Sequence, residues 1–159
     1  MPATISNQRD LVVQLLGELL YVERRLAGGV LRDLISSVSD ERLADELRKH
    51  LEQTKAHAER CETAFRKLEV PPSANQSRAF ESAVAEHDEL ASSIASDRLA
   101  DVFHAKAALQ TEHLEIALYT AVLALGFDDA LAPLRESLAD EHEARELLER
   151  ELRRLADAG

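Results

Sequence analysis

The chain has 159 residues, of which 45% are hydrophobic and 31% charged, and it contains few glycines, prolines and aromatic side chains. This profile is typical of an all-helical globular protein, and the length suits a single domain spanning residues 1–159. The formal net charge of −11 argues against a nucleic-acid partner, which needs a basic face, and no apolar run approaches the roughly 20 residues of a membrane span.

The first predicted helix runs from about Ser6 to Ser36. Its apolar positions repeat at intervals close to 3.6 residues, the period of an amphipathic helix. They include Leu15, Leu19, Leu26 and Val30. Gly28 and Gly29 weaken the helix near its end, because glycine loses more conformational freedom on folding than other residues. We therefore expect a bend or a close approach of another helix at this point.

The second predicted helix follows a short turn and is capped by Ser39 or Asp40, whose side chains can accept a hydrogen bond from a first-turn amide. Its apolar stripe continues through Leu43, Leu47, Leu51, Phe65 and Leu68. Pro71 and Pro72 end it, because proline disfavours a helical conformation in the residue before it. They open the segment 71–77 (PPSANQS), the only stretch with a turn-like composition.

Three further helices are predicted after this loop. A short one of about four turns is marked by its apolar residues Phe80, Val84, Leu90 and Ile94. A break near Ser96–Asp97 separates it from a long helix that ends at Gly126, which suits a helix C-terminus. Asp128 or Asp129 opens the last helix, whose apolar positions are Leu131, Leu134, Leu138, Leu148, Leu152 and Leu155.

The connections between these helices predict the architecture. The turns near residues 39 and 126 are short, so the first two helices and the last two should form antiparallel hairpins. A long connection with its own short helix joins the two hairpins. This arrangement is an all-α, ferritin-like four-helix bundle with a short extra helix in the crossover.

Five polar residues fall on the apolar stripes of the four main helices rather than on their wet faces. They are Glu23, His57, Glu112, Glu115 and Glu141. A single glutamate in such a position is usually one that reaches solvent near a helix end. Here, however, each of the four helices carries one near mid-height. Glu112 and Glu115 also lie one turn apart on one face, a spacing that lets two carboxylates bridge two cations.

The electrostatics of such a cluster favour metal. Four carboxylates within a few ångströms cannot all stay ionised in a dry interior, so some must take protons or bind cations. Two divalent cations would neutralise four such charges, with His57 as a neutral nitrogen ligand. Carboxylates together with imidazole suit iron or manganese, and we expect one or two ions per chain. Calcium is less suited, because rigid helices make a poor oxygen cage.

Four other polar residues leave alternatives open. His50 lies on the stripe of the second helix, where core or edge packing is favoured over ligation. His104 precedes Glu112 by two turns and is assigned to helix packing. Cys61 suits a small core residue, with thiolate ligation as a minor alternative. Tyr119 either hydrogen-bonds a ligating carboxylate or simply fills the core.

The cysteine content and the N-terminal segment bear on location. A single cysteine excludes an internal disulfide and fits a reducing compartment. The first ten residues (MPATISNQRD) lack a basic region followed by an apolar core, so no signal peptide is visible. We therefore expect the protein to be cytoplasmic.

Four segments together resemble the YciF/YciE family of ferritin-like stress proteins. These segments are LLGELLYVERRL (15–26), HLEQTKAHAERCETAF (50–65), EHLEIALYTAVLALG (112–126) and ESLADEHEARELL (136–148). The resemblance implies a rubrerythrin-like bundle, often a homodimer, with a role in the stress response. It also implies a site made of Glu23, His57, Glu112, Glu115 and Glu141.

The chain departs from the usual ligand set at two positions. A ferritin-like site normally has a Glu-x-x-His motif on two helices. Here Thr54 stands where the glutamate of the second helix belongs, and Ala144 stands where the histidine of the last helix belongs. One carboxylate and one nitrogen are therefore missing from a full set.

Two functions compete on this basis. The first is a metal-binding protein with weak oxidase or peroxidase activity. The alternative is a non-catalytic helical dimer or interaction protein with a degenerate, partly or wholly metal-free site. The long helix favours the alternative, since a second apolar side needs a cover: Phe103, Ala107, Leu114, Leu118, Ala121 and Leu125. A small-molecule site in the bundle core has no signal beyond the polar interior.

Overall fold

The computed structural model describes residues 4–158, and the regular elements in this part of the chain are helical. They are α1 (Gln8–Arg25), the π-helical turn η1 (Leu26–Val30), α2 (Leu31–Ser37), α3 (Glu41–Lys67), α4 (Arg78–Ala91), α5 (Asp97–Ala124), α6 (Asp128–Leu131) and α7 (Leu134–Asp157). The predicted all-α class is confirmed, and no described helix is both long and apolar enough to span a bilayer.

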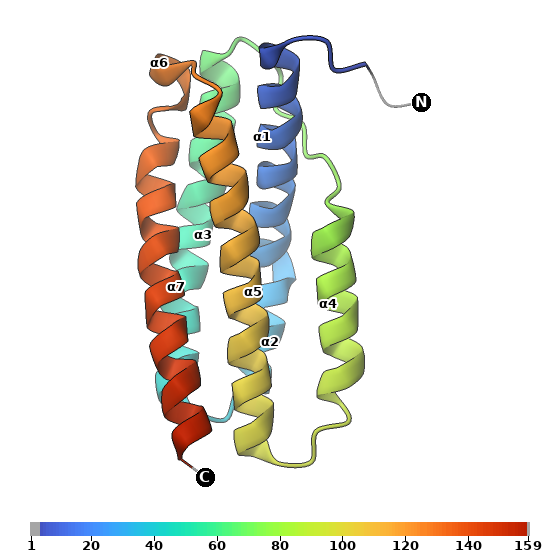
Figure 1. Ribbon diagram of the computed structural model, residues 1–159, viewed down its shortest axis with the longest axis vertical. Coiled ribbons are helices and arrows are strands. Elements are labelled where there is room, and N and C mark those ends of the chain that lie inside the picture. The colour runs from blue at the N-terminus through green and yellow to red at the C-terminus, as the bar shows by residue number, and fades with distance from the viewer. Residues whose placement is uncertain (1–3, 159) are drawn as a thin grey trace.

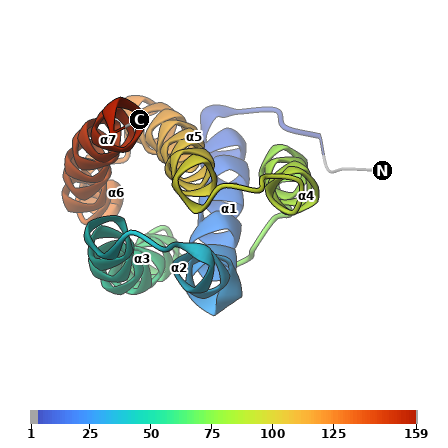
Figure 2. The ribbon, with the colours of Figure 1, turned by 90° about the horizontal axis from the view of Figure 1, so that it is seen from below.

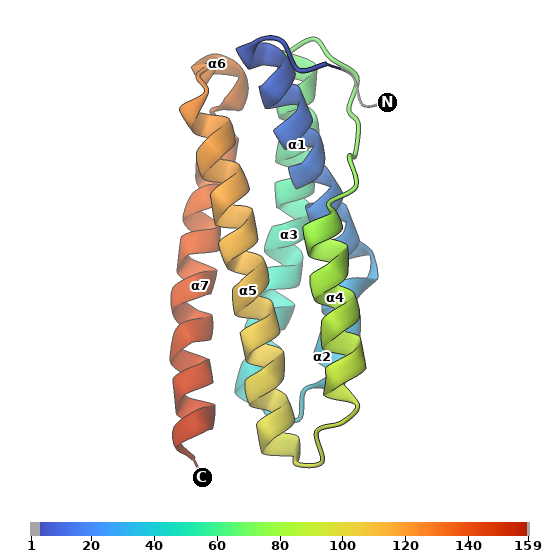
Figure 3. The ribbon, with the colours of Figure 1, turned by 45° about the vertical axis from the view of Figure 1, so that its right-hand side comes forward.

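The long helices form a closed ring of four. The hairpin of α1–α2 and α3 packs beside the hairpin of α5 and α7 (Figure 1), and each main helix contacts two neighbours around the ring. Helix α4 lies outside this ring against α5, as the view along the bundle shows (Figure 2). The crossover runs down the bundle first as the loop after α3 and then as α4, which lies beside the half of the bundle where α5 starts (Figure 3). The predicted hairpins and crossover helix are confirmed.

Four helices begin at a side chain that accepts a hydrogen bond from a first-turn amide. These caps are Asn7 for α1, Asp40 for α3, Ser77 for α4 and Ser96 for α5. Such a bond satisfies one of the amides that a helix start leaves without an intrahelical partner. The predicted start of the second helix at residues 39–40 and the break at residues 96–97 are therefore confirmed.

The first predicted helix is continuous in space but changes direction at its glycines. Gly29 has non-helical torsion angles (φ 179°, ψ −42°) within the π-helical turn. Beyond this turn, α2 packs against α3, whereas α1 contacts both α3 and α5. The expected bend at Gly28–Gly29 is thus confirmed, and it leads the end of this helix away from α5.

Two predicted helix boundaries were wrong. Helix α3 ends at Lys67, before the prolines, because Glu69 takes a left-handed conformation (φ 55°) and Val70 donates to the carbonyl of Phe65. The last helix was expected to be one element from Asp128 onward. It is instead two, α6 and α7, because Pro133 has no amide hydrogen with which to continue the first.

Two apolar clusters fill the bundle, one toward each end. One is built around the start of α1 and the end of α3: it includes Val12, Leu16, Leu20, Phe65, Val122 and Leu134. The other is built around the end of α1 and the start of α3: it includes Val22, Leu34, Leu43, Leu47, Phe80 and Leu148. Buried polar side chains from all four helices occupy the level between these clusters. The packing thus fixes the height at which that polar layer sits.

Candidate metal centre

The predicted ligands converge in the buried polar layer. Glu23 comes from α1, His57 from α3, Glu112 and Glu115 from α5, and Glu141 from α7. Each exposes at most 1% of its surface. Because the apolar stripe of each helix faces the bundle axis, a polar residue on the stripe must enter the core with it.

The side chains form two adjoining groups that could each hold a metal ion. The His57 group consists of Glu23, His57 and Glu141. The His50 group consists of His50, Glu112, Glu115 and Glu141. Within each group, one ligand atom per residue lies within 4.8 Å of the others.

Glu141 belongs to both groups, and its two oxygens face different histidines. Its Oε1 lies 2.7 Å from Nδ1 of His57, and its Oε2 lies 3.9 Å from Nε2 of His50. On the far side, Nε2 of His50 lies 2.9 Å from Oε1 of Glu112, while Nδ1 of His57 lies 3.5 Å from Oε1 of Glu23. Glu141 could therefore offer one carboxylate oxygen to each group.

His50 is the functional candidate that the sequence pattern undervalued. It was expected at the core or edge, but the structure brings it into the cluster with a nitrogen close to Glu112. Thr54, in the place of the missing glutamate, turns its hydroxyl to the carbonyl of His50. Ala144 is buried and offers no ligand atom. His50 therefore supplies a second nitrogen from a position one turn before Thr54.

Two other residues lie outside both groups. His104 pairs across to the crossover helix, with its Nδ1 2.9 Å from Nε2 of His87, so the packing interpretation holds for it. Cys61 is fully buried in the apolar cluster near Tyr119, and burial raises the pKa of its thiol well above the usual range. A neutral thiol suits a core residue better than a ligand.

Neighbouring side chains hold two of the candidate ligands in place. Nε2 of His57 lies 3.1 Å from a carboxylate oxygen of Asp140, which also accepts from Arg60 at 3.4 Å. The hydroxyl of Tyr119 donates to Glu23 at 2.5 Å, so this tyrosine hydrogen-bonds a candidate ligand as well as filling the core. Metal-ligating histidines commonly direct their second ring nitrogen at a carboxylate, as His57 does at Asp140. Asp140 was missed because it sits at the edge of its stripe, and its only signal is adjacency to Glu141.

The carboxyl groups on α5 are far from ordinary glutamates. Burial raises the pKa of Glu115 well above its usual value, and the nearby carboxylates of Glu141 and Glu23 raise it further. Burial likewise raises the pKa of Glu112 to about 8, although His50 works in the opposite direction. Without a cation, both groups therefore take up a proton more readily than ordinary glutamates do.

The histidines show the opposite balance. Burial works to lower the pKa of both, but their carboxylate neighbours outweigh it and raise the pKa of His50 to about 9 and of His57 to about 11. Burial works to raise the pKa of Glu141, but its hydrogen bond with His57 brings it below the usual value. The two histidines that flank Glu141 therefore both favour their protonated, positively charged form.

The residues present fit a metal ion. Among the described residues, Glu115 has no hydrogen-bond partner for either carboxylate oxygen, and Oε2 of Glu23 and of Glu112 also lack one. A buried polar atom without a partner is costly, so native interiors rarely contain several together. Carboxylate oxygens and imidazole nitrogens aimed at a common space are the donor set of a divalent cation.

Comparison with known proteins places this site in a ferritin-like fold. The chain is similar to YcfI from Rhodopseudomonas palustris, with 29% identity, a TM-score of 0.89, and coverage of 94% of this chain and 97% of that one. It is also similar to the Escherichia coli stress protein YciF, with 24% identity, a TM-score of 0.90, and coverage of 98% and 100%. No curated protein matches the chain.

A third structure carries the fold as part of a larger protein. It is a two-domain protein from Anabaena variabilis with DJ-1/ThiJ/PfpI-like and ferritin-like domains, with 21% identity and a TM-score of 0.68. The match covers 97% of this chain and 39% of that one, and it confirms the ferritin-like bundle. The model of the family named "Domain of unknown function (DUF892)" matches residues 7–159. The chain therefore belongs to the DUF892 family, which confirms its resemblance to the YciF-type proteins.

Proposed function

We propose that the protein binds iron or manganese, one or two ions per chain, in the buried polar layer. The ligands in this proposal are Glu23, His57, Glu112, Glu115 and Glu141, with His50 added from the structure. The observation that carries it is Glu115, whose two carboxylate oxygens are buried without a partner among the described residues. We take residues 1–159 as one ferritin-like domain, because the site draws on helices of both hairpins.

The charge balance of the polar layer supports cations over protons. Four carboxyl groups and two imidazoles share one dry space, and two protonated imidazoles would neutralise only half of four carboxylates. The remaining carboxyl groups must then be held neutral at pH values well above their usual pKa, which destabilises the fold. Two divalent cations balance the four carboxylates without that penalty. Metal binding would therefore release protons and stabilise the native state.

The two groups are unequal, which predicts two unequal ions. The His50 group offers three carboxylates and one imidazole, and the His57 group offers two carboxylates and one imidazole. Oxygen-rich donor sets with imidazole suit iron and manganese. Bound iron would supply redox chemistry toward dioxygen or peroxide, and an oxidase or peroxidase activity is part of the proposal. Tyr119 and Asp140 would orient ligands.

A titration of the metal-stripped protein tests this proposal. Mn²⁺ binding is followed by the electron paramagnetic resonance signal of the free ion, and bound iron is counted by elemental analysis after anaerobic loading. We expect up to two ions in the wild type, weakening of one in Glu23→Gln, and weakening of both in Glu141→Gln. Glu59→Gln, on the exposed face of α3, is the control. Equal, low uptake by all four proteins would overturn the proposal.

A metal-free helical dimer is the second candidate. Thr54 and Ala144 in place of ligands favour it, as does the apolar surface left at the turn between α4 and α5, where Leu90 and Leu99 are 45% and 50% exposed. We propose that the chain forms a homodimer in either case. Sedimentation equilibrium of the wild type and of Leu99→Glu tests this, with a monomeric variant expected. A monomeric wild type would refute the dimer.

The setting in the cell is also a proposal. The resemblance to YciF-type stress proteins supports a stress-related role, and the single cysteine, which cannot form an internal disulfide, supports a cytoplasmic location. A deletion strain challenged with peroxide or high osmolarity tests the role. Survival of the deletion strain equal to that of the parent strain under both stresses would count against it.

A further inference from the structure

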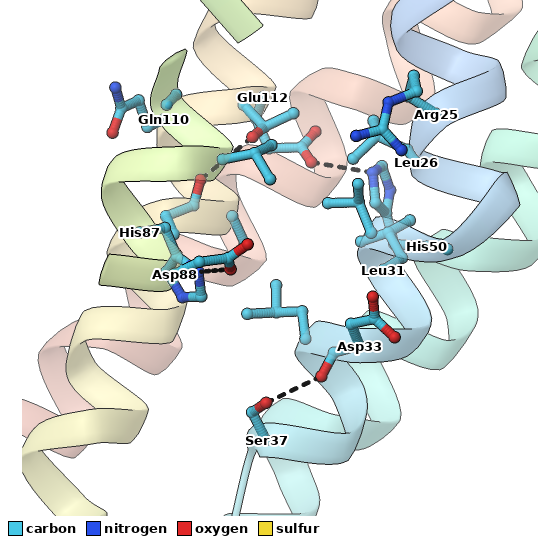
Figure 4. A pocket seen from close by; sticks show the side chains of 18 of the residues that line it. Arg25, Leu26, Leu31, Asp33, Ser37, His50, His87, Asp88, Gln110 and Glu112 are labelled. Carbon is cyan, nitrogen blue, oxygen red and sulfur yellow. Dashed lines mark hydrogen bonds and ion pairs between the residues drawn. The ribbon is translucent and has the colours of Figure 1, made fainter. Parts of the chain in front are cut away.

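A cavity of about 210 Å³ lies beside the buried polar layer, on the side facing the crossover helix α4. Figure 4 shows its lining, with His50 and Glu112 at one end and Asp33 and Ser37 at the other. The walls come from η1 and α2, from α4 and from α5, and His50 enters from α3. None of the predicted functions uses this space.

The bend at Gly29 accounts for the cavity. Helix α1 packs on α5, but beyond Gly29 the chain turns toward α3, so α2 no longer fills the space in front of α5. Small side chains on the opposite walls, including Ala83 and Ala107, leave it open. A π-helical turn of this kind often marks a functional site.

The cavity connects the surface to the buried ligands. Exposed side chains such as Lys106 and Gln110 line it together with His50 and Glu112, which are 5% and 1% exposed. Apolar side chains form much of the wall between these ends: Leu26, Val30, Leu31, Leu34 and Val84. A concave space with apolar walls and a few polar groups at one end is the usual form of a small-molecule site.

The charges around the cavity favour an uncharged molecule. At the surface, Lys106 is offset by Asp33 and Asp88, and all three are exposed. Arg25 is held by Glu81, with Nε 2.7 Å from its carboxylate, so it is not free to pair with an anion. At the inner end, the imidazole of His50 is paired with the carboxyl group of Glu112, with Nε2 2.9 Å from Oε1. An anionic guest would therefore meet no unpaired buried cation there.

We propose that this cavity binds an uncharged organic molecule of about benzene's size or slightly larger, with an apolar body and one hydroxyl or carbonyl group directed at His50 and Glu112. The size follows from comparison with dry cavities of about 150 Å³, which bind benzene. The proposal deepens the metal-binding function, since the polar group would lie beside the His50 group. The binding of this molecule, however, depends only on the cavity and does not need a bound metal ion.

Two neighbouring glycines provide a matched test. Gly29 lines the cavity and Gly28 does not, and a Cβ atom added at either would meet nothing within 4 Å. Phenol is the probe, titrated into ¹³C-methyl-labelled, metal-free protein. We expect shifts in the methyl groups of Leu31 and Val84, equal affinity in Gly28→Leu, and at least about tenfold weaker binding in Gly29→Leu.

A second pair of variants keeps the test decisive if the glycine variants fail to fold. Ala107→Leu fills the cavity from α5, and Ala117→Leu, on the exposed face of the same helix, is its control. We also expect benzoate, of similar size but charged, to bind at least about tenfold more weakly than phenol. No phenol binding to the wild type, equal affinity in the filled and control variants, or equal binding of benzoate would overturn the proposal.

The same experiment separates this inference from metal binding. In Mn²⁺-loaded protein, bound phenol should show enhanced proton relaxation that is absent in Glu141→Gln, whose side chain does not line the cavity. If no Mn²⁺ binds but phenol is still excluded by Gly29→Leu, the metal proposal fails and the cavity proposal stands. If Mn²⁺ binds and phenol is not excluded by either filled variant, the reverse holds.

Discussion

Replacing Glu115 by glutamine should stabilise the metal-free protein at neutral pH. The Glu115 carboxyl group is fully buried, has no hydrogen-bond partner among residues 4–158, and faces other carboxylates. Glutamine has nearly the same shape but carries no charge and needs no proton. The substitution therefore removes an electrostatic penalty while leaving the packing of α5 against α7 in place.

The magnitude follows from the cost of keeping this group protonated. Holding a carboxyl group of ordinary pKa 4.5 neutral at pH 7 costs about 3 kcal/mol, since each pH unit above the pKa adds about 1.4 kcal/mol. Because the pKa of Glu115 is raised in the folded state, this group costs no stability below pH 4.5. The cost to the free energy of unfolding grows as the pH rises above that value. Glu115→Gln should thus gain up to about 3 kcal/mol at pH 7, or about 6–12 °C in Tm, and little at pH 4.5.

Urea unfolding in excess chelator at pH 4.5 and pH 7 measures this difference. Glu59→Gln, at an exposed site, should change stability by less than about 0.5 kcal/mol at both pH values. In saturating Mn²⁺ the order should reverse, because the wild type gains binding energy that the variant lacks. A Glu115→Gln protein that is less stable than the wild type at pH 7 without metal would refute this reasoning.

Three further predictions concern the same layer. Metal-free wild type should lose stability from pH 5 to pH 9, because the raised pKa values of Glu112 (about 8) and His50 (about 9) let the folded protein keep protons that the unfolded chain releases over this range. Mn²⁺-loaded protein should not show this loss, and thermal melts at both pH values measure the difference. Tyr119→Phe should lower Mn²⁺ affinity about tenfold and metal-free stability by about 1 kcal/mol, measured by calorimetric titration and urea melts; unchanged affinity would mean that its hydroxyl does not position a ligand. Asp140→Asn should weaken the ion near His57 by roughly 10–100-fold and leave the second ion unchanged; equal loss of both would contradict the two-group description.

Local signals were enough to predict most of the helices. Amphipathic periodicity and a capping side chain, such as Asp40 or Ser96, act within one or two turns, so they can be read without knowing the fold. The divided last helix was missed although Pro133 is visible in the sequence, because the apolar pattern runs through it without a break. The early end of α3 depends on Glu69 in a left-handed conformation, which glutamate rarely adopts.

The site shows where periodicity stops being informative. A helical wheel gives the direction of a side chain but not which side chain of another helix stands opposite it, and that pairing decides which side chains meet. His50 was undervalued for this reason, because its role depends on Glu112 standing opposite it on a different helix. The cavity could not be predicted either. It arises from the direction that the chain takes after Gly29, which depends on the packing of α2 against α3.

Crystals of the protein saturated with Mn²⁺, recorded at an X-ray energy where manganese scatters anomalously, provide the most direct test. The account predicts two unequal anomalous peaks on either side of the Glu141 carboxylate, about 3.5–4 Å apart, with His57 at one and His50 at the other. An anomalous map with no peak in this layer, and with the four buried carboxyl groups unmoved, would contradict it.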